Sequence, residues 1–368
     1  MESAHNMNVL SKILLTPIAS LYGFITALRN GLFDINILKS TSFDIPVICV
    51  GNATVGGTGK TPHTEYIISL LHKKYRVATL SRGYKRKTRG FVLASETSKV
   101  SDIGDESMQI YRKFPGVIVA CCEKRVEGIK RLLALPEPPQ VIVLDDAYQH
   151  RYVKAGMNIL LCDYNRPIYQ DKMLPLGRLR ENFKNAVHRA THVVVTKCPS
   201  VLTPIEKRVI MNSLDMYPFQ QLYYSKIGYG QPATLAGTMS EQGFSEWLEE
   251  RCAEHASVLV VTGIASPRPF LKQIKKHFPD RCKILPFKDH NRYSDADLNK
   301  ITKEFNTLPQ GPKYIITTEK DAVKLSELSL PGWVENLYYV PIQVTFFDGK
   351  ATLSEAVLSY VAKNQTKR

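Results

Sequence analysis

The chain has 368 residues, 44% hydrophobic and 23% charged, which predicts a globular protein of about two domains at roughly 150 residues each. Intrinsic disorder, collagen and coiled coil are excluded by this composition. The seven cysteines include no CxxC spacing. They fit a reducing compartment and argue against a disulfide framework or a zinc site.

The net charge of +15 is concentrated in two windows of the chain. Residues 51–100 hold ten Lys and Arg against two acids, and residues 151–200 hold nine against three. The first fifty residues balance at three against three, so no polybasic tail supplies the excess. This distribution predicts a partner with several negative charges, and phosphate-bearing small molecules, nucleic acid and an anionic membrane all fit it.

Residues 7–33 predict an amphipathic helix that Pro17 kinks or divides. The uncharged run from Ile13 to Leu28 has 16 residues, fewer than the 18 that a spanning helix needs, so we predict that the chain does not cross a bilayer. The start MESAHNMN has no basic region typical of a signal peptide. Two interpretations stay open for this segment, a helix buried against the protein and a helix on a membrane surface.

Short β-branched runs then alternate with helical stretches, which predicts an α/β fold with a doubly wound, mostly parallel sheet covered on both faces. The expected strands are Pro46–Gly51, Arg76–Leu80, Val117–Ala120, Val141–Leu144, Ile159–Cys162 and His192–Thr196.

A second, smaller α/β unit is predicted to begin near Ser257. Two longer alternating segments, Gln221–Tyr229 and Leu337–Phe346, are expected to pair as a connector between the units. The predicted division is an N-terminal helical segment over 1–33, a phosphate-binding domain over 34–220 and a smaller lid domain over 221–368.

The strongest local pattern is IPVICVGNATVGGTGKTPHTEYIISLL, residues 45–71. A strand that enters a Gly-rich loop and then a helix is typical of a phosphate cradle, because backbone N–H groups and the helix dipole face the anion. Thr54 stands where the strict motif has its first Gly. We expect Lys60 to reach the β/γ oxygens and Thr61 to ligate Mg²⁺. The predicted nucleotide-binding residues are Thr54, Gly56, Gly57, Thr58, Gly59, Lys60 and Thr61.

Downstream, Asp145 and Asp146 directly follow a buried strand in VIVLDDAYQHR. Carboxylates at this position of a neighbouring parallel strand hold Mg²⁺ in P-loop proteins, so both are predicted metal ligands. The alternative is a strand-to-loop turn with solvated acids. His150 fits either the site or the surface.

Three further segments carry charge whose role composition leaves open. The first, SRGYKRKTRG over 81–90, is a basic loop. The second, GDES over 104–107, offers Asp105 and Glu106 as candidate bases. The third, LPLGRLREN over 174–182, places two arginines beside an acid, which suits the clamping of an anionic group.

Taken together and in order, the motifs VGNxxxGGTGKT, SRGY, GDE, DDxxQH, LPxGRLRE, DHxxY and TTEKDAVK resemble the tetraacyldisaccharide 4′-kinase (lipid A kinase) family over about residues 45–325. The resemblance implies transfer of the γ-phosphate of ATP to the 4′-hydroxyl of a tetraacyldisaccharide 1-phosphate. It also implies Mg²⁺ as cofactor, a lipid A precursor as substrate, and a peripheral location at the cytoplasmic face of the inner membrane.

Roles for individual residues follow from the resemblance. It implies that Asp105 is the catalytic base, paired with His290 of the second unit, so that closure of the two units assembles the base. Lys60, from the Gly-rich loop, completes the predicted catalytic set. The resemblance implies that Tyr84, Arg180 and Glu181 bind the acceptor and that Asp145 and Asp146 ligate the metal. The predicted acceptor set also includes Arg178, and the predicted metal ligands include Thr61, both from the residue patterns above. The sequence departs from the family in DDAYQH, at Ala147 and Tyr148, and has GDES in place of GDEP.

Two other classes of protein share part of this pattern. A membrane-associated switch ATPase shares the N-terminal helix and the variant loop, and it would hydrolyse ATP without an acceptor. A nucleic-acid binder would use the basic windows, but these lack the interleaved aromatics that stack bases, so no nucleic-acid partner is expected.

Overall fold

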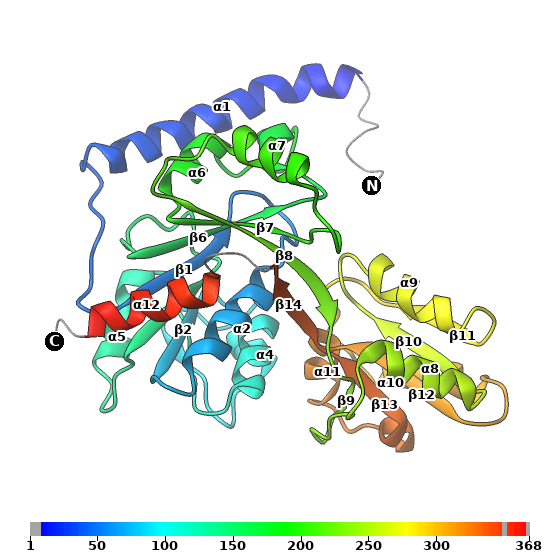
Figure 1. The fold of residues 1–368 in the computed structure, drawn as a ribbon. Helices are drawn as coiled ribbons and strands as arrows, with labels where there is room; N and C mark the ends of the chain where they lie inside the picture. The colour runs from blue at the N-terminus through cyan, green and yellow to red at the C-terminus, as the bar shows by residue number, and fades with distance from the viewer. Residues whose placement is uncertain (1–8, 348–351, 366–368) are drawn as a thin grey trace.

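The computed structural model describes residues 9–347 and 352–365, and these form two α/β units side by side (Figure 1). The larger unit contains a nine-stranded sheet in the order β14-β8-β7-β6-β1-β5-β2-β4-β3. The smaller unit contains a five-stranded sheet in the order β11-β10-β12-β13-β9. The predicted fold class is therefore confirmed.

The large sheet is parallel except at its two edges, where β3 and β14 run antiparallel to their neighbours. All six strands expected in this region form, and the central ones are buried on both faces because their side chains are apolar throughout. The strands of this sheet are β1 Val47–Asn52, β2 Val77–Ser81, β3 Val92–Leu93, β4 Ile118–Cys121, β5 Val141–Asp145, β6 Met157–Asp163, β7 His192–Thr196, β8 Gln221–Tyr229 and β14 Ile342–Phe346.

Helices cover both faces of this sheet and enclose one apolar cluster on each. One cluster includes side chains from α5, α6 and α7, and the other includes side chains from α2, α4 and α12. The helices of this unit are α2 Lys60–Leu71, α3 Val100–Ile103, α4 Asp105–Lys113, α5 Arg125–Leu133, the 3₁₀ helix η1 Ile168–Gln170, α6 Phe183–Arg189, α7 Pro204–Leu214 and α12 Leu353–Gln365.

The smaller unit follows the same layered plan, with apolar clusters on both faces of its sheet. Its strands are β9 Ala233–Thr234, β10 Ser257–Thr262, β11 Cys282–Pro286, β12 Lys313–Thr318 and β13 Leu337–Val340. Its helices are α8 Phe244–Ala253, α9 Arg268–His277, α10 Asp295–Asn306, α11 Glu319–Leu325 and the 3₁₀ helix η2 Gly332–Asn336.

The connector differs from the sequence prediction in its second segment. The expected strand Leu337–Phe346 is interrupted at Pro341, which lacks the N–H needed to continue a ladder. Its first half, β13, joins the small sheet, whereas β14 pairs with β8 as expected and both extend the large sheet.

The predicted assignment of all of residues 221–368 to the smaller unit is wrong for the end of the chain. Helix α12 returns to the larger unit, where Leu353, Val357 and Val361 are buried in the cluster that includes α2. The apolar spacing of this helix requires a partner face, and the large sheet supplies it. After Pro341 the chain therefore belongs structurally to the first unit.

Helix α1, Val9–Asp34, runs without a break through Pro17, so the predicted division there is wrong. It lies along the top of the larger unit in Figure 1. Its side-chain hydrogen bonds to that unit come from its second half, where Tyr22 donates to the Arg180 carbonyl at 3.0 Å. Ala19 and Phe33 are buried. Most of its apolar side chains are exposed, which contradicts the buried-helix interpretation.

By length and composition, Lys12–Asp34 qualifies as a helix that could cross a membrane, which the sequence prediction had excluded. Such a helix near the start of a chain is weak evidence for a span, because signal sequences and core helices pass the same test. Only about a tenth (11%) of its most apolar window is buried against the protein.

A buried charged cluster joins the two units where α11 packs on α4. Lys113 Nζ lies 2.7 Å from Glu65 Oε2 and 3.0 Å from Glu319 Oε1. Gln109 donates to both carboxylates, at 2.6 and 3.1 Å. Burial, followed by the nearby Glu319 carboxylate, raises the pKa of Glu65 to about 7 from its ordinary 4.5.

This cluster predicts how stability depends on pH. Between about pH 4.5 and 7 the folded protein keeps a proton on Glu65 that the unfolded chain has lost, so stability decreases as pH rises through this window. Glu65→Gln imitates the protonated acid. We expect thermal denaturation to show a smaller decrease in Tm over this window for the variant than for the wild type. The exposed Glu137→Gln is the control, and equal slopes in all three proteins would contradict the prediction.

Candidate active site

The Gly-rich loop connects the carboxyl end of β1 to the N-terminus of α2, as the sequence predicts. Gly56 and Gly59 have φ values of 114° and 87°, a region that glycine enters without steric cost. The side chain of Asn52 donates to Thr58 Oγ1 at 2.8 Å, and Thr196 Oγ1 donates to the Thr58 carbonyl at 2.8 Å. The loop is therefore held from β1 and from β7, two strands separated by β6 in the sheet, with Lys60 as the first helical residue.

The segment LPLGRLRE lies against this loop. Val55 N donates to the Arg178 carbonyl at 2.8 Å, and Arg180 N donates to the Ala53 carbonyl at 2.8 Å. A Cβ at Gly56 would lie 3.4 Å from Arg178 Nη1. The structure thus brings both predicted arginines to the rim of the loop.

The acid pair sits at the end of β5, next to β1. Asp145 is buried and accepts a hydrogen bond from Thr64 Oγ1 at 2.8 Å. Asp146 lies 3.7 Å from Lys60 Nζ and 3.2 Å from Arg180 Nη1. Burial, together with the adjacent Asp146 carboxylate, raises the pKa of Asp145.

Glu106, the second carboxylate of GDES, belongs to the same electrostatic environment. Burial and the negative charge of Asp145 raise the pKa of Glu106 to about 7, although the ammonium groups of Lys320 and Lys60 oppose this rise. Negative charge is therefore crowded beside the loop, and such crowding favours a bound cation.

The residues present fit a magnesium ion. Within residues 9–347 and 352–365 no three His, Cys, Asp or Glu side chains form a ready-made metal cage. Mg²⁺ bound with a nucleotide needs only one or two carboxylates, because phosphate oxygens and water complete its shell. Asp145 and Asp146, with the Thr61 hydroxyl, supply donors of this kind.

The predicted base pair is assembled across the two units. Asp105 begins α4 of the larger unit, and His290 follows β11 of the smaller one. His290 Nδ1 lies 2.7 Å from Asp105 Oδ2, although 185 residues separate them in sequence. Burial alone would raise the pKa of Asp105, but the His290 hydrogen bond and the Lys320 and Lys324 ammonium groups hold it below its ordinary value.

A cavity of about 230 Å³ opens beside this pair, between the units. Tyr84 is 59% exposed at its edge, and its ring centroid lies 5.4 Å from that of His290. Lys85 and Arg292 also line the cavity. The basic loop predicted from SRGYKRKTRG therefore faces the base pair, and its lining suits an anionic ligand.

The carboxylate of Glu181, a predicted acceptor-binding residue, is hydrogen-bonded to other side chains of the protein. Its carboxylate accepts hydrogen bonds from Arg189 at 2.7 and 2.9 Å, from Asn30 of α1 at 3.0 Å and from Gln149 at 3.1 Å. It thereby connects α1 to the loop after the acid pair. Its contact with an acceptor stays a prediction.

His150 packs near the same junction, where its Nε2 accepts a hydrogen bond from Arg125 N at 3.3 Å. Burial, and then the positive charge of Arg125, lowers the pKa of His150 to about 4. This histidine is therefore neutral at physiological pH, and the two interpretations of its role stay open.

Sequence reasoning gave no role to three lysines that the structure brings to the site. Lys320 Nζ lies 3.4 Å from Asp105 Oδ2 and 3.3 Å from His290 Nε2, and Lys324 Nζ lies 3.8 Å from Asp105. Both lie in the motif TTEKDAVK, and this motif could have marked them as candidate site residues. Lys197 donates to the Gly57 carbonyl and pairs with Asp163 at 2.6 Å, and no motif marked it.

A strand, Gly-rich loop and helix beside an acid pair, of which Asp145 is buried, define an α/β protein of the P-loop class. Residues 11–362 match the tetraacyldisaccharide-1-P 4′-kinase family. This chain therefore belongs to the tetraacyldisaccharide 4′-kinase family, as the order of its motifs predicted.

Individual relatives agree with this assignment. A tetraacyldisaccharide 4′-kinase from Flavobacterium johnsoniae is 48% identical over 358 residues, covering 97% of this chain and 99% of the relative. One from Parabacteroides distasonis is 47% identical over 353 residues, covering 95% of this chain and 94% of the relative. The crystal structure of LpxK from Aquifex aeolicus in complex with ATP is 28% identical, with a TM-score of 0.71, covering 96% of this chain and 99% of that one.

Proposed function

We propose that this chain transfers the γ-phosphate of ATP to the 4′-hydroxyl of a tetraacyldisaccharide 1-phosphate, a step of lipid A biosynthesis. The observation that carries the proposal is the Asp105–His290 contact of 2.7 Å beside a P-loop, in a chain 44–48% identical to tetraacyldisaccharide 4′-kinases. A carboxylate oriented by an imidazole is the arrangement that a transfer to an alcohol requires.

In the proposed reaction, the oxygen of the acceptor's 4′-hydroxyl attacks the γ-phosphorus of ATP. Asp105 accepts the proton that this hydroxyl loses. The bond from that phosphorus to the β–γ bridging oxygen breaks, and ADP leaves with the electron pair. The lowered pKa of Asp105 keeps its carboxylate ionised, so that its oxygens can accept a hydrogen bond from the attacking hydroxyl. His290 fixes the orientation of the carboxylate through its Nδ1.

Phosphoryl transfer depends mainly on positioning and on neutralisation of phosphate charge. Lys60 and the backbone of the loop from Gly56 to Thr61 hold the β- and γ-phosphates in this proposal. Mg²⁺, held by Thr61, Asp145 and Asp146, would neutralise charge on the phosphate oxygens. Arg178 and Arg180 lie at the loop's rim and bind further anionic groups.

The acceptor occupies the region between the two units, where Tyr84 and the cavity beside His290 lie. The hydroxyl must approach Asp105 on one side and the loop on the other. Contacts between α4 and α11 bring the units together, so closure of the smaller unit completes the site.

The direct test supplies ATP labelled on its γ-phosphate together with purified tetraacyldisaccharide 1-phosphate. Label should appear in the lipid, and no lipid should be labelled when the acceptor is omitted. Asp105→Asn is the negative control. Label released mainly as inorganic phosphate, at a rate that the acceptor does not change, would favour the switch ATPase over the kinase.

We also propose that α1 attaches the protein peripherally to the cytoplasmic face of the inner membrane. Ile13, Leu14 and Leu21 are 60–65% exposed, and burying such side chains in lipid gains roughly 1.5 to 3 kcal/mol each. The acceptor itself, with four acyl chains, stays in that membrane.

Leu21→Glu combined with Ile25→Glu tests the attachment and leaves the buried Phe33 anchor in place. We expect this variant to move from the membrane to the soluble fraction and to show a severalfold higher apparent KM for vesicle-embedded acceptor. Turnover of detergent-dispersed acceptor should stay within severalfold of wild type. Unchanged fractionation would contradict a membrane role for α1.

A further inference from the structure

Exposed apolar side chains gather in a second segment of this protein, far from α1 in sequence. Twenty large apolar side chains are exposed among the described residues; nine lie between Ile13 and Ile37, and six lie between Val201 and Phe219. The six are Val201, Ile205, Val209, Met211, Tyr217 and Phe219, with exposures from 45% to 76%. An apolar group of this kind on a protein surface marks a site of interaction.

Helix α7 presents two opposite faces. Ile210 and Leu214 are buried against the large sheet, whereas Ile205 and Val209, one turn apart, are 76% and 54% exposed. The outward pair therefore contributes little to the core. Its exposure needs an explanation outside the fold.

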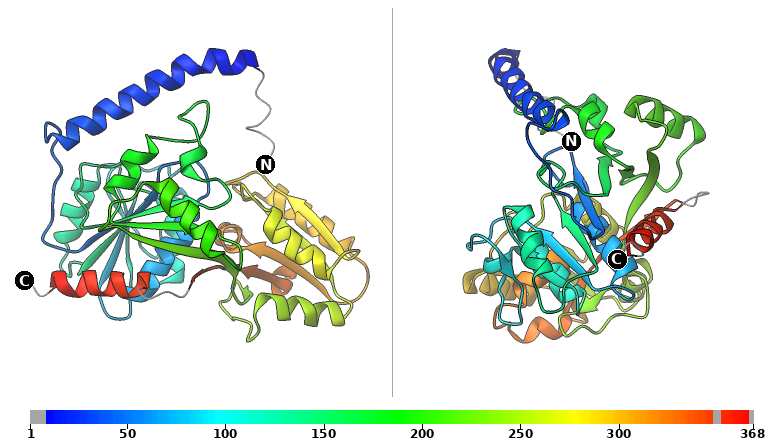
Figure 2. Two further views of the ribbon diagram at one scale, coloured as in Figure 1. Left: turned by 45° about the horizontal axis from the view of Figure 1, so that its top comes forward. Right: turned by 90° about the vertical axis from the view of Figure 1, so that its left-hand side faces the viewer.

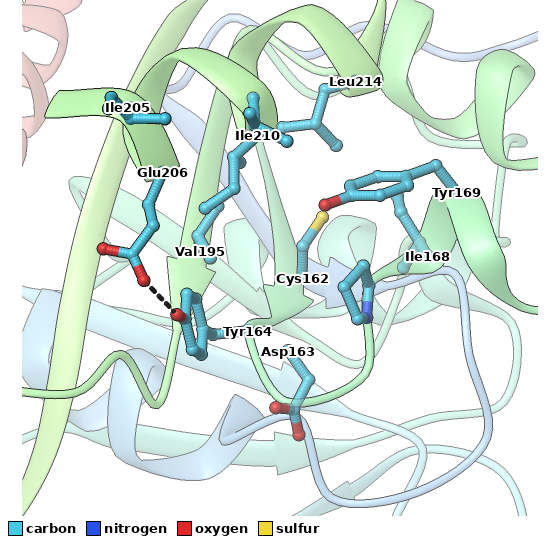
Figure 3. A pocket seen from close by; sticks show the side chains of 12 residues that line it. Cys162, Asp163, Tyr164, Ile168, Tyr169, Val195, Ile205, Glu206, Ile210 and Leu214 are labelled. Carbon is cyan, nitrogen blue, oxygen red and sulfur yellow. Dashed lines mark hydrogen bonds between the residues drawn. The ribbon is translucent and has the colours of Figure 1, made fainter. Parts of the chain in front are cut away.

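Beneath this exposed face lies an apolar cavity of about 320 Å³ (Figure 3). Ile205 and Val209 line it together with Ile168 of η1 and Val195 of β7. Because two of its lining residues are exposed, the cavity opens on the same face as the exposed side chains. Its polar groups are mostly paired: Tyr164 donates to Glu206 at 3.0 Å, and Asp163 pairs with Lys197.

The position of the exposed face and the composition around it point to a lipid surface as the partner. In Figures 1 and 2, α7 lies at the same end of the larger unit as α1. Residues 201–219 themselves balance at two Lys and Arg against two Asp and Glu. The preceding residues 166–200 hold seven against two, and this neighbouring excess favours an anionic surface. Tyr217 and Phe219 stack at 5.7 Å, and aromatic side chains are enriched where protein meets the headgroup layer.

We propose that α7 and the turn after it, residues 201–219, form a second membrane-contact surface that inserts Ile205, Val209 and Phe219 into an anionic bilayer. Together with α1 it gives the protein two separate contacts with the membrane, which fix its orientation. The identity of the partner as a lipid surface rests on the proposed function; the surface itself does not depend on catalysis.

Tryptophan fluorescence tests insertion directly. The two native tryptophans, Trp247 and Trp333, are 1% and 5% exposed and lie in the smaller unit, so they give a constant background. Val209→Trp should shift its emission to shorter wavelength when vesicles of phosphatidylethanolamine and phosphatidylglycerol are added. Met239→Trp, at a 56% exposed position in the smaller unit, should show no shift. An unshifted Val209→Trp in protein that sediments with the vesicles would overturn the proposal.

Binding measurements supply the second test. Ile205→Glu combined with Val209→Glu should lower partition into these vesicles by roughly tenfold or more, with unchanged Tm and unchanged activity on detergent-dispersed acceptor. Met239→Glu should bind as wild type. If the double variant partitions into vesicles as the wild type does, the proposed membrane-contact surface is refuted. It is also refuted if the wild type is a dimer and the double variant a monomer, because the partner of this surface is then a second copy of the chain. Either result leaves the kinase assay unaffected.

Discussion

Lys60→Ala is expected to reduce kcat/KM to about a hundredth or less while the protein stays folded. Lys60 begins α2 with its ammonium 3.7 Å from Asp146, at the position where a P-loop lysine neutralises the β- and γ-phosphates. A loss of two decades corresponds to about 2.7 kcal/mol of transition-state stabilisation.

The measurement compares initial rates with labelled ATP for Lys60→Ala, Lys60→Arg and the exposed Lys73→Ala, which lies just beyond the other end of α2. Lys60→Arg keeps the charge but changes its shape, so we expect an intermediate rate. Lys73→Ala should match the wild type. The increase in Tm that ATP produces should also shrink in Lys60→Ala. Retention of more than about a tenth of the activity would contradict the phosphate-binding role.

The fold of the larger unit could be predicted because short stretches of its sequence specify its strands and its Gly-rich loop. The strands near the Gly-rich loop are continuous apolar runs, and the loop itself carries glycines at positions that need positive φ. Parallel strands place their carboxyl ends at one edge of the sheet, so the approach of Asp145 to the loop follows from order alone.

Contacts between distant segments were not predictable from spacing. The Asp105–His290 pair spans 185 residues, and only the family resemblance suggested it. Lys320 reaches both of these residues because α11 packs on α4, a docking of two units that no periodicity encodes. The return of α12 to the first unit is missed for the same reason: its apolar face shows that it needs a partner but does not say which one.

Glu181 illustrates how a correct neighbourhood leaves a role open. The motif LPLGRLRE places it beside the loop, but Arg189, two turns further along the chain, takes both of its oxygens. A sequence shows that an acid is near a site more readily than it shows which cation the acid will bind.

The second large effect concerns the base. Asp105→Asn and His290→Ala should each lower kcat by about 10² or more, because the first removes the proton acceptor and the second removes the group that orients it. If the two act as one unit across the two domains, the double variant should be barely slower than either single variant.

Turnover on detergent-dispersed acceptor measures this, with His277→Ala on α9 as a control in the same smaller unit. ATP-dependent stabilisation should survive in all of these variants, since neither Asp105 nor His290 belongs to the loop that holds the phosphates. Losses that multiply in the double variant would mean that the two side chains contribute separately. The 2.7 Å contact between His290 and Asp105 would then have no part in the reaction. A different carboxylate would have to accept the proton, and Glu106, the next residue in the sequence, would be the first candidate.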